Sequence, residues 1–229
     1  MTNHITKKHN EVNQIHFINQ IINGDCIDIL RWMPSETVDL IVTDPPYGVR
    51  YKSRDGRTII GDNTLKWLYP SFRQIYRVLK NNSMCLSFYG WQKADIFLDT
   101  WRAVGFQPIS HFVFIKNYSS KKGFASAHHE SAYLLAKGKP QKPIQPPKDI
   151  QSWKYTGNRL HPTQKPVESL KTIIKAYSKH GDIILDPFAG SGSTAVAAQE
   201  LGRFYIGIEK DFNYADIAQK RMKNRKKAA

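Results

Sequence analysis

The sequence predicts an α/β fold in which helices pack on a mostly parallel sheet. Two runs of β-forming residues, 38–43 and 183–185, each end abruptly in a short polar or glycine-rich motif. Parallel strands that are buried on both faces appear in a sequence as nearly continuous apolar runs. Open α/β sheets bind their ligands where such strands end. Between and around these runs, helix-like and strand-like segments alternate, which is the pattern of α/β folds.

In the first half of the chain, runs of β-branched and aromatic residues predict strands at 15–22, 38–43, 84–89, 109–116 and 131–136. Helices are predicted at 28–33, 67–79 and 94–103, where apolar residues recur at helical spacing or a helix-breaking residue follows. Pro34 and Gly105 end the first and last of these helices, because neither residue continues a helix well.

The second half contains a compact βαβ unit. Pro166 suits a first helical turn and opens a helix at 167–180. A strand at 183–185, a helix at 193–201 and a strand at 204–208 follow. Gly202 suits the C-terminal cap between the last two, and a final helix is predicted at 214–223.

Length and composition indicate one substantial domain. The chain has 229 residues, of which 41% are hydrophobic, so it can bury a real core. No run approaches about 18 uninterrupted apolar residues, and none is expected to span a membrane. Cys26 and Cys85 lack the spacing of metal ligands, which predicts two free thiols in a reducing cytoplasm and no metal site.

We divide the chain into a flexible tail at 1–14, a catalytic domain at 15–222 and a basic tail at 223–229. Within the domain, residues 50–63 are polar, basic and without a period, which predicts a mobile loop. Residues 91–160 include long stretches rich in Lys, Gly and Pro, and we interpret this region as a small basic recognition insert.

The charge is large and unevenly distributed. The formal net charge is +15 at pH 7, and residues 112–180 hold 13 Lys and Arg against 3 Asp and Glu. Residues 181–216, around the glycine-rich motif, hold 2 basic and 6 acidic residues instead. This division indicates a polyanion such as nucleic acid on one side and a cationic small molecule on the other, although a solvated basic face would look similar.

The second motif, 186–192, predicts a cofactor site. Gly190 and Gly192 let the backbone turn sharply and admit a ligand without a Cβ in the way. Glu209 ends the next strand, where a carboxylate can accept hydrogen bonds from ribose hydroxyls. The spacing of Gly190, Gly192 and Ala195 also fits a dinucleotide fingerprint, but a lone match is weak and leaves the first motif unexplained. The acidic surroundings favour a sulfonium such as S-adenosylmethionine over a pyrophosphate.

The first motif, Asp44-Pro45-Pro46-Tyr47, suits chemistry on an exocyclic amine of a nucleobase. Such an amine is a poor nucleophile because its lone pair is delocalised into the ring. Asp44 and the Pro45 carbonyl can accept its two N–H hydrogens, and the paired prolines hold both acceptors in place. Tyr47 offers a face on which a flipped base can stack. The alternative is an ordinary strand-to-loop turn.

The sequence resembles the β-group amino-methyltransferases of DNA, in which the catalytic motif precedes the target-recognition region and the cofactor motif follows it. The resemblance covers most of residues 20–222 and is thin only across the recognition insert. The matching segments are residues 23–26, Asp44 to Tyr47, His161-Pro162-Thr163-Gln164-Lys165-Pro166, residues 186–194 and residues 206–209.

The resemblance implies a class I methyltransferase fold with a seven-stranded, mostly parallel sheet and S-adenosylmethionine as methyl donor. The catalytic residues would be Asp44, Pro45, Pro46 and Tyr47. The cofactor-binding residues would be Asp25, Cys26, Asp44, His161, Thr163, Asp186, Phe188, Gly190, Gly192, Ser193, Glu209 and Lys210. A first-position Asp is more usual for adenine N6 than for cytosine N4, so the resemblance favours adenine.

Double-stranded DNA is therefore the expected partner, bound by a monomer or homodimer inside a prokaryotic cell or a phage-infected host. The resemblance to similar sequences suggests a phage or prophage origin. The sequence does not imply a cognate restriction enzyme. The candidate DNA-binding residues are the basic side chains Arg50, Lys52, Arg54, Arg57, Lys121, Lys122 and Lys154. The short recognition region, 91–160, predicts a short or relaxed target sequence.

Some residues fit a structural role better than a functional one. Trp101 lies within a predicted amphipathic helix and is expected in the core, whereas Trp153 is a weaker candidate for contact with nucleic acid. His128 and His129 lack a spaced third ligand, so we interpret them as loop residues. His161 is not needed as a general base, because the amine can lose its proton after methyl transfer.

Two kinds of rival function remain. The first changes the acceptor to cytosine N4, to RNA or to a protein side chain. RNA and protein enzymes of this type often carry Asn in the first position and place the cofactor motif first, and both features point away from them here. The second rival is a catalytically idle DNA-binding protein built on the same fold, which the intact Asp44, Tyr47 and Glu209 disfavour.

Overall fold

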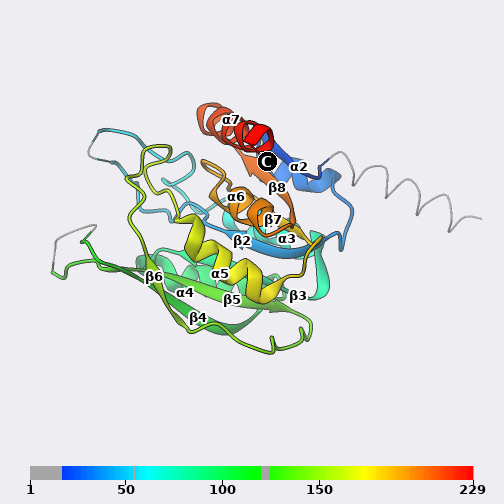
Figure 1. The fold of residues 1–229 in the computed structure, drawn as a ribbon. Coiled ribbons are helices and arrows are strands. Elements are labelled where there is room, and N and C mark those ends of the chain that lie inside the picture. The colour runs from blue at the N-terminus through cyan, green and yellow to red at the C-terminus, as the bar shows by residue number, and fades with distance from the viewer. Residues whose placement is uncertain (1–16, 54, 120–123, 229) are drawn as a thin grey trace, which may run out of the picture.

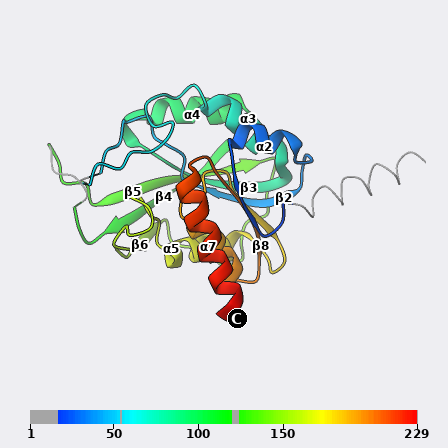
Figure 2. The same cartoon turned by 90° about the horizontal axis from the view of Figure 1, so that it is seen from above.

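The computed structural model describes residues 17–53, 55–119 and 124–228, with the side chains of 226–228 left out. It contains a central sheet between two layers of helices (Figures 1 and 2). The predicted tail at 1–14, Arg54, Lys121 and Lys122 lie outside the described residues. The α/β prediction is confirmed.

The sheet has eight strands in the order β1-β8-β7-β2-β3-β5-β4-β6. In chain order they are β1 (Gln20–Asn23), β2 (Val38–Thr43), β3 (Leu79–Tyr89), β4 (Gln107–Lys116), β5 (His129–Lys137), β6 (Ile150–Trp153), β7 (Ile183–Asp186) and β8 (Phe204–Glu209). Only β5 runs against its neighbours β3 and β4, and every other described pairing is parallel. Seven strands therefore end at the same edge, and β5 begins there.

Helices cover both faces of the sheet. They are α2 (Cys26–Trp32), α3 (Leu68–Val78), α4 (Ala94–Ala103), α5 (Val167–Tyr177), α6 (Ser193–Glu200) and α7 (Phe212–Ala228), with a short 3₁₀ turn η1 (Trp91–Lys93) before α4. Figure 2 shows α2, α3 and α4 on one side, and α5 and α7 on the other. Each layer buries its own apolar cluster against the sheet.

Spacing explains which helical side chains reach the core. In α3 the residues Leu68, Phe72, Ile75 and Val78 follow one another at helical intervals, and all are buried. Trp101 of α4 is fully buried against the rings of Phe72 and Phe97, which confirms its predicted core position. Among the described residues, no helix is both long enough and apolar enough to cross a bilayer.

Three predicted features differ from the structure. The sheet has eight strands rather than seven, because Ile150–Trp153 pairs in parallel with β4 inside a stretch that has no strand-like pattern of its own. The last helix runs through Ala228 rather than ending at Lys223, so most of the predicted basic tail is helical. The strand expected at 15–22 is shorter, since residues 17–19 form a turn and β1 begins at Gln20.

The order of the strands determines where the chemistry gathers. At the shared edge, β1, β8 and β7 lead to Asp25, Glu209 and Asp186, and β2 leads to Asp44. Beyond β2, the edge carries residues from β3, β5, β4 and β6. Asp44 therefore stands between two groups of strand ends that are far apart in sequence.

Candidate active site

A cavity of about 1480 Å³ opens at this edge of the sheet. A pocket for one drug-sized ligand is typically about 300–1,000 Å³, so the cavity has room for a second molecule. We call the part lined by Asp25, Cys26, Asp186, Phe188, Gly190 and Glu209 the cofactor half. The acceptor half is lined by Asp44, Pro45, Pro46, Tyr47, Phe88, Lys116, Glu130, Trp153 and Lys165.

At the start of α2, Asp25 caps the helix and enters the cofactor half. Its Oδ1 accepts a hydrogen bond from the Ile27 N–H at 2.9 Å, and its Oδ2 pairs with Lys210 Nζ at 2.8 Å. Burial raises the pKa of the Asp25 carboxyl, but these two donors outweigh burial and lower it below its ordinary value. Cys26, the next residue, is buried, and burial raises the pKa of its thiol, so it lines the cavity as a neutral group.

Backbone N–H groups hold the Glu209 carboxylate in place. Gly190 N–H donates to Oε2 at 2.7 Å and Asp211 N–H donates to Oε1 at 2.8 Å. Burial raises the pKa of Glu209, and the two N–H groups oppose that rise. A carboxylate has about four acceptor positions, so lone pairs remain for hydroxyl groups of a ligand.

The glycine-rich turn is braced by Asp186. Its Oδ1 accepts the Phe188 N–H at 3.1 Å, and its Oδ2 accepts the Thr194 hydroxyl at 2.7 Å. Burial raises the pKa of Asp186 to about 7 despite these bonds. Gly190 and Gly192 both have positive φ, but Gly192 lies behind the cavity against Ala218 rather than on its wall.

Phe188 and Trp67 form an aromatic wall, with ring centroids 5.1 Å apart in an edge-to-face arrangement. Sequence reasoning missed Trp67, because it stands just before α3 and carries no local motif.

The His161–Pro166 segment supplies five residues in succession, His161 to Lys165, to the lining of the cavity. The Thr163 N–H lies 3.3 Å from His161 Nδ1, and the His161 ring packs on Tyr214 with centroids 4.3 Å apart. Burial lowers the pKa of His161 to about 3, and the positive charges of Lys165 and Arg57 act in the same direction. His161 is therefore neutral at physiological pH.

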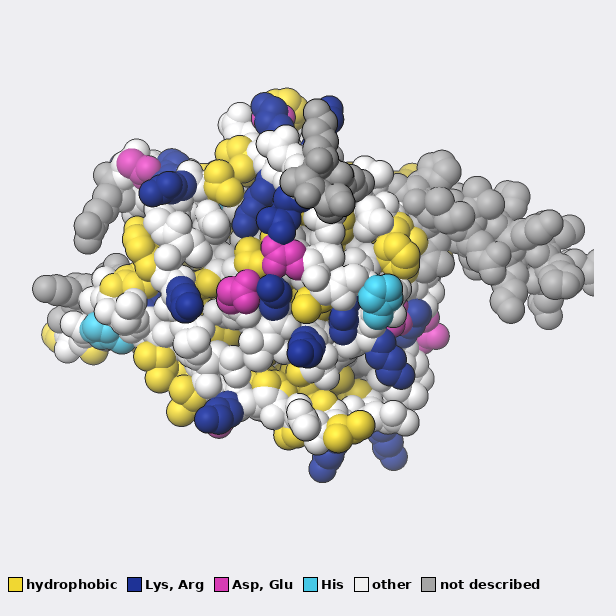
Figure 3. Space-filling model, in the orientation of Figure 1, with side chains coloured by type: hydrophobic (Ala, Val, Ile, Leu, Met, Phe, Trp, Pro, Cys, Tyr) yellow, Lys and Arg dark blue, Asp and Glu magenta, His cyan; other side chains and the backbone are white. Residues whose placement is uncertain are grey.

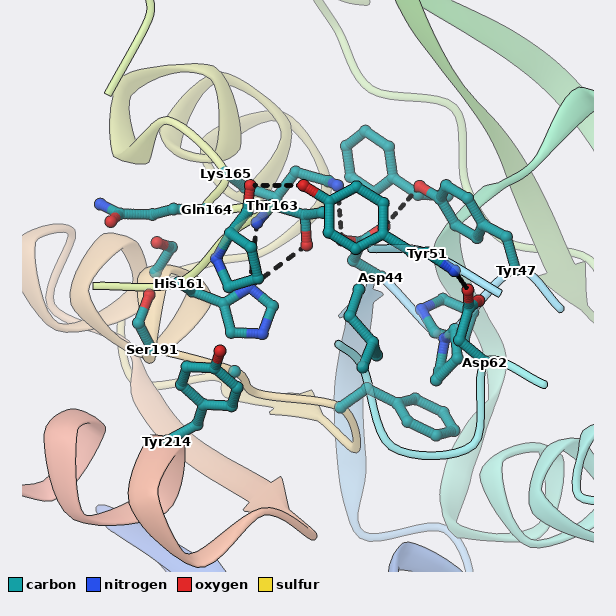
Figure 4. Close-up of a pocket in the computed structure, with 18 of the residues that line it drawn as sticks. Asp44, Tyr47, Tyr51, Asp62, His161, Thr163, Gln164, Lys165, Ser191 and Tyr214 are labelled. Atoms are coloured by element: carbon teal, nitrogen blue, oxygen red, sulfur yellow. Dashed lines mark hydrogen bonds and ion pairs between the residues drawn. The ribbon is translucent and has the colours of Figure 1, made fainter. Parts of the chain in front are cut away.

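Asp44 is held by one side chain close to it in the sequence and one far from it. The Tyr47 hydroxyl donates to Oδ1 at 2.6 Å, and Lys165 Nζ makes a short ion pair with Oδ2 (Figure 4). Burial raises the pKa of Asp44, and the Lys165 ammonium opposes the rise most strongly. Lys165 belongs to the 161–166 motif, but its partner lies 121 residues away, so no local pattern predicts the pair.

A second ion pair lines the acceptor half. Lys116 Nζ at the end of β4 lies 2.8 Å from Glu130 Oε1 on β5, and the Lys116 side chain is only 2% exposed. The predicted recognition insert supplies both residues, since 91–160 contains β4 and β5.

A buried carboxylate organises the segment that follows the first motif. Asp62 accepts the N–H groups of Gly48 and Tyr51, and its own carbonyl accepts the Arg50 N–H at 2.8 Å. Lys52 and Thr58 form an isolated antiparallel bridge within the same segment. The loop predicted at 50–63 therefore has an ordered anchor at its end, and Asp62 was not foreseen. The mobility of the loop at 50–63 stays a prediction.

The candidate DNA-binding residues surround the cavity unequally. Arg50, Lys52 and Arg57 line it, and Arg57 pairs with Asp55 at 2.8 Å, whereas exposed Lys154 lies outside it. Figure 3 shows Lys and Arg side chains spread over the face that carries α5 and α6, with fewer acidic ones. Trp153, which was a weaker candidate, is buried and lines the cavity.

Both cysteines are buried and form no disulfide, as predicted. Of the predicted catalytic and cofactor-binding residues, all except Gly192 line this one cavity.

Comparisons with known proteins agree with the motifs. A family model for DNA methylases, N6_N4_Mtase, matches residues 38–220. The YubD protein of Escherichia coli (strain K12), named as a methylase, is 48% identical over 205 residues, covering 90% of each chain. The type II methyltransferase M.HinfI of Haemophilus influenzae is 29% identical over 248 aligned positions, covering 90% of this chain and 69% of its own length.

Solved structures share the fold. The M1.HpyAVI–SAM complex has a TM-score of 0.70 at 24% identity, covering 89% of this chain and 98% of its own. The PvuII DNA methyltransferase, described as cytosine-N4-specific, has a TM-score of 0.69 at 15% identity, covering 88% and 89%. These likenesses confirm the class I methyltransferase fold, and the family model spans most of the sequence. The chain belongs to the N6_N4_Mtase family of DNA methylases.

Proposed function

We propose that this chain transfers a methyl group from S-adenosylmethionine to the exocyclic N6 of adenine in double-stranded DNA. The observation that carries the proposal is the position of Asp44, between a cofactor half and an acceptor half of one cavity. A first-motif Asp, which is more usual for adenine N6, supports adenine as the acceptor.

The residues of the cofactor half fit S-adenosylmethionine. Phe188 and Trp67 offer apolar surface to a purine ring, and Glu209 has lone pairs free for ribose hydroxyls. Asp25, Glu209 and Asp211 make the cofactor half acidic, which suits a cationic ligand. We assign the adenosine end to Asp25, Cys26, Phe188, Glu209 and Lys210, and the methionine end to His161, Thr163, Asp186, Gly190 and Ser193.

In the acceptor half, the Asp44 carboxylate and the Pro45 carbonyl accept the two N–H hydrogens of the target amine. This draws the amine nitrogen toward a tetrahedral shape and makes its lone pair available, and the paired prolines hold the acceptors still. S-adenosylmethionine supplies the electrophilic methyl group. The amine releases its proton after transfer, so the neutral His161, with its pKa near 3, is not required as a base.

Asp44 and Pro45 line the cavity and Pro45 is buried, so a target base has to leave the helix to reach them. Tyr47 supplies a stacking surface, and the cations Arg50, Lys52 and Arg57 at the cavity and Lys154 outside it contact phosphates. Arg54, Lys121 and Lys122 are further candidates by charge. The small recognition region reads a short or relaxed target, which methylation-sensitive sequencing of host DNA tests. A long, fully fixed site would reject this part of the proposal.

Nucleoside mass spectrometry of DNA from cells that express the chain tests the proposal, with Asp44→Ala as the matched control. The expected product is N6-methyladenine in the wild type and not in the variant. An N4-methylcytosine product would assign the chain to the cytosine branch, and no methylated base above the control would reject DNA methylation.

A further inference from the structure

Lys165 is a buried cation in the acceptor half, with no role in the methyl transfer proposed above. Its side chain is 9% exposed, and that of its partner Asp44 is 19% exposed. The Lys165 ammonium also lies 4.8 Å from the ring centroid of Phe88, 5.4 Å from that of Trp153 and 6.0 Å from that of Tyr47. Ring faces attract a cation at these distances, so the ammonium is held where it meets the Asp44 carboxylate.

Apart from Lys165 and the Tyr47 hydroxyl, the main influences on Asp44 oppose its negative charge. Burial removes water from the carboxylate, and the Glu130 carboxylate across the cavity adds repulsion. Lys116 pairs with Glu130 and tempers that repulsion. The titratable or charged groups that face Asp44 are Tyr47 after β2, Lys165 before α5, Glu130 of β5 with its partner Lys116 of β4, Asp186 of β7 and the neutral His161.

We propose that Lys165 is a positioning residue: it is the counter-ion that keeps Asp44 ionised and aimed at the target amine. A protonated Asp44 would donate a hydrogen bond instead of accepting one, and could no longer draw the amine nitrogen toward a reactive shape. A carboxylate has about four acceptor positions, so it can keep Lys165 while it accepts an amine N–H. The proposal rests on the proposed function only for its catalytic consequence.

The ionisation of Asp44 can be measured without DNA or turnover. Carbon-13 NMR of aspartate-labelled protein follows each carboxyl through a pH titration, and Asp44→Asn identifies the Asp44 signal. An opposite charge at close range lowers the pKa of a carboxyl by about 1–3 units, so Lys165→Met should raise the pKa of Asp44 by that amount. Lys165→Arg should keep the wild-type value, and exposed Lys175→Met on α5 is the matched control.

Activity gives the second readout. In Lys165→Met the acid limb of the kcat/KM profile should move to higher pH by the same shift, while the Kd for S-adenosylmethionine stays within about twofold. Adding Lys165→Met to Asp44→Asn should cost no more activity than Asp44→Asn alone. If the wild type proves inactive on DNA, the NMR titration still decides the role of Lys165.

Two results would overturn the proposal. The first is an Asp44 signal that titrates at the same pH in wild type and Lys165→Met. The second is a loss of activity in Lys165→Met that is equal at every pH and accompanied by weaker cofactor binding, because a merely structural anchor predicts that pattern.

Discussion

The two halves of the cavity hold their carboxylates by different means. In the cofactor half, Glu209 is fixed by the N–H groups of Gly190 and Asp211, and Asp186 by the Phe188 N–H and the Thr194 hydroxyl. In the acceptor half, Asp44 is held by the side chains of Lys165 and Tyr47. Backbone donors belong to the fold and stay in place, whereas side-chain partners can rearrange when a substrate arrives. The cofactor half thus combines backbone donors with the side chains of Thr194 and Lys210, whereas the bonds to the Asp44 carboxylate come from side chains alone among those described.

The largest effect is expected from a substitution at Asp44, which should lower kcat and leave cofactor binding almost unchanged. Asp44→Asn removes the charge that we propose accepts the target amine, and we expect kcat to fall by about 10²–10⁴-fold, the range of a lost acid–base or acceptor group. The Kd for S-adenosylmethionine should change far less. Single-turnover kinetics and isothermal titration calorimetry measure the two quantities. If Asp44→Asn kept its kcat but bound S-adenosylmethionine more weakly, Asp44 would belong to the cofactor half instead.

Glu209→Gln should give the opposite pattern. Hydrogen bonds to a charged group contribute about 1.5–3 kcal/mol, so the Kd for S-adenosylmethionine should rise about 10–100-fold. The kcat at saturating cofactor should be nearly unchanged, because Glu209 does not reach the target amine. Glu168→Gln, on the exposed side of α5, serves as the control. A fall in kcat with unchanged Kd would break the division between the halves.

Asp186 provides a test in the pH dependence of stability. Burial raises its pKa to about 7, above the ordinary value of 3.8, so the unfolded chain binds fewer protons between these limits. The contribution of Asp186 to the free energy of unfolding is therefore present at low pH and falls as pH rises toward 7, by on the order of 1 kcal/mol per pH unit. Asp186→Asn should flatten this fall in urea unfolding at pH 5, 6 and 8. An unchanged slope would show that Asp186 stays ionised.

The ion pair of Lys116 and Glu130 gives the smallest effect. Lys116→Met leaves Glu130 without its cation, and because Glu130 is 26% exposed we expect a loss of about 1–3 kcal/mol rather than the full value of a buried pair. Urea unfolding measures it, and Lys116→Met with Glu130→Leu should recover most of the loss. No recovery in the double variant would mean that Lys116 stabilises the fold through other contacts.

The same contrast explains what the sequence could predict. The cofactor half is assembled from short local signals: a helix-capping Asp25, a glycine turn, and a Glu209 that ends a strand. Such bonds join residues close in the chain or in one βαβ unit, and so their pattern is visible. The strand Val38–Thr43 and the helix Ala94–Ala103 were predicted with their observed bounds, because a buried run and an amphipathic period mark them.

The rest depended on contacts between distant segments. Lys165 meets Asp44 across 121 residues, and Asp62 reaches back 14 residues to the Gly48 N–H. Strand β6 is only four residues long and forms because it can pair with the edge strand β4. Its sequence therefore shows no alternating hydrophobic pattern that would predict it. The beginning of β3 is polar, and pairing with β2 and β5 makes it a strand.

We propose that Asp44 joins a cofactor-binding half of the cavity to an acceptor half that modifies adenine. Incubation of the purified chain with unmethylated duplex DNA and S-adenosylmethionine carrying a deuterated methyl group tests it directly, with nucleosides read by mass spectrometry. We predict label on adenine N6 with the wild type, no label with Asp44→Ala, and label restored in Glu209→Gln at high cofactor concentration. Equal labelling by wild type and Asp44→Ala, or no label on adenine from the wild type, would contradict the account.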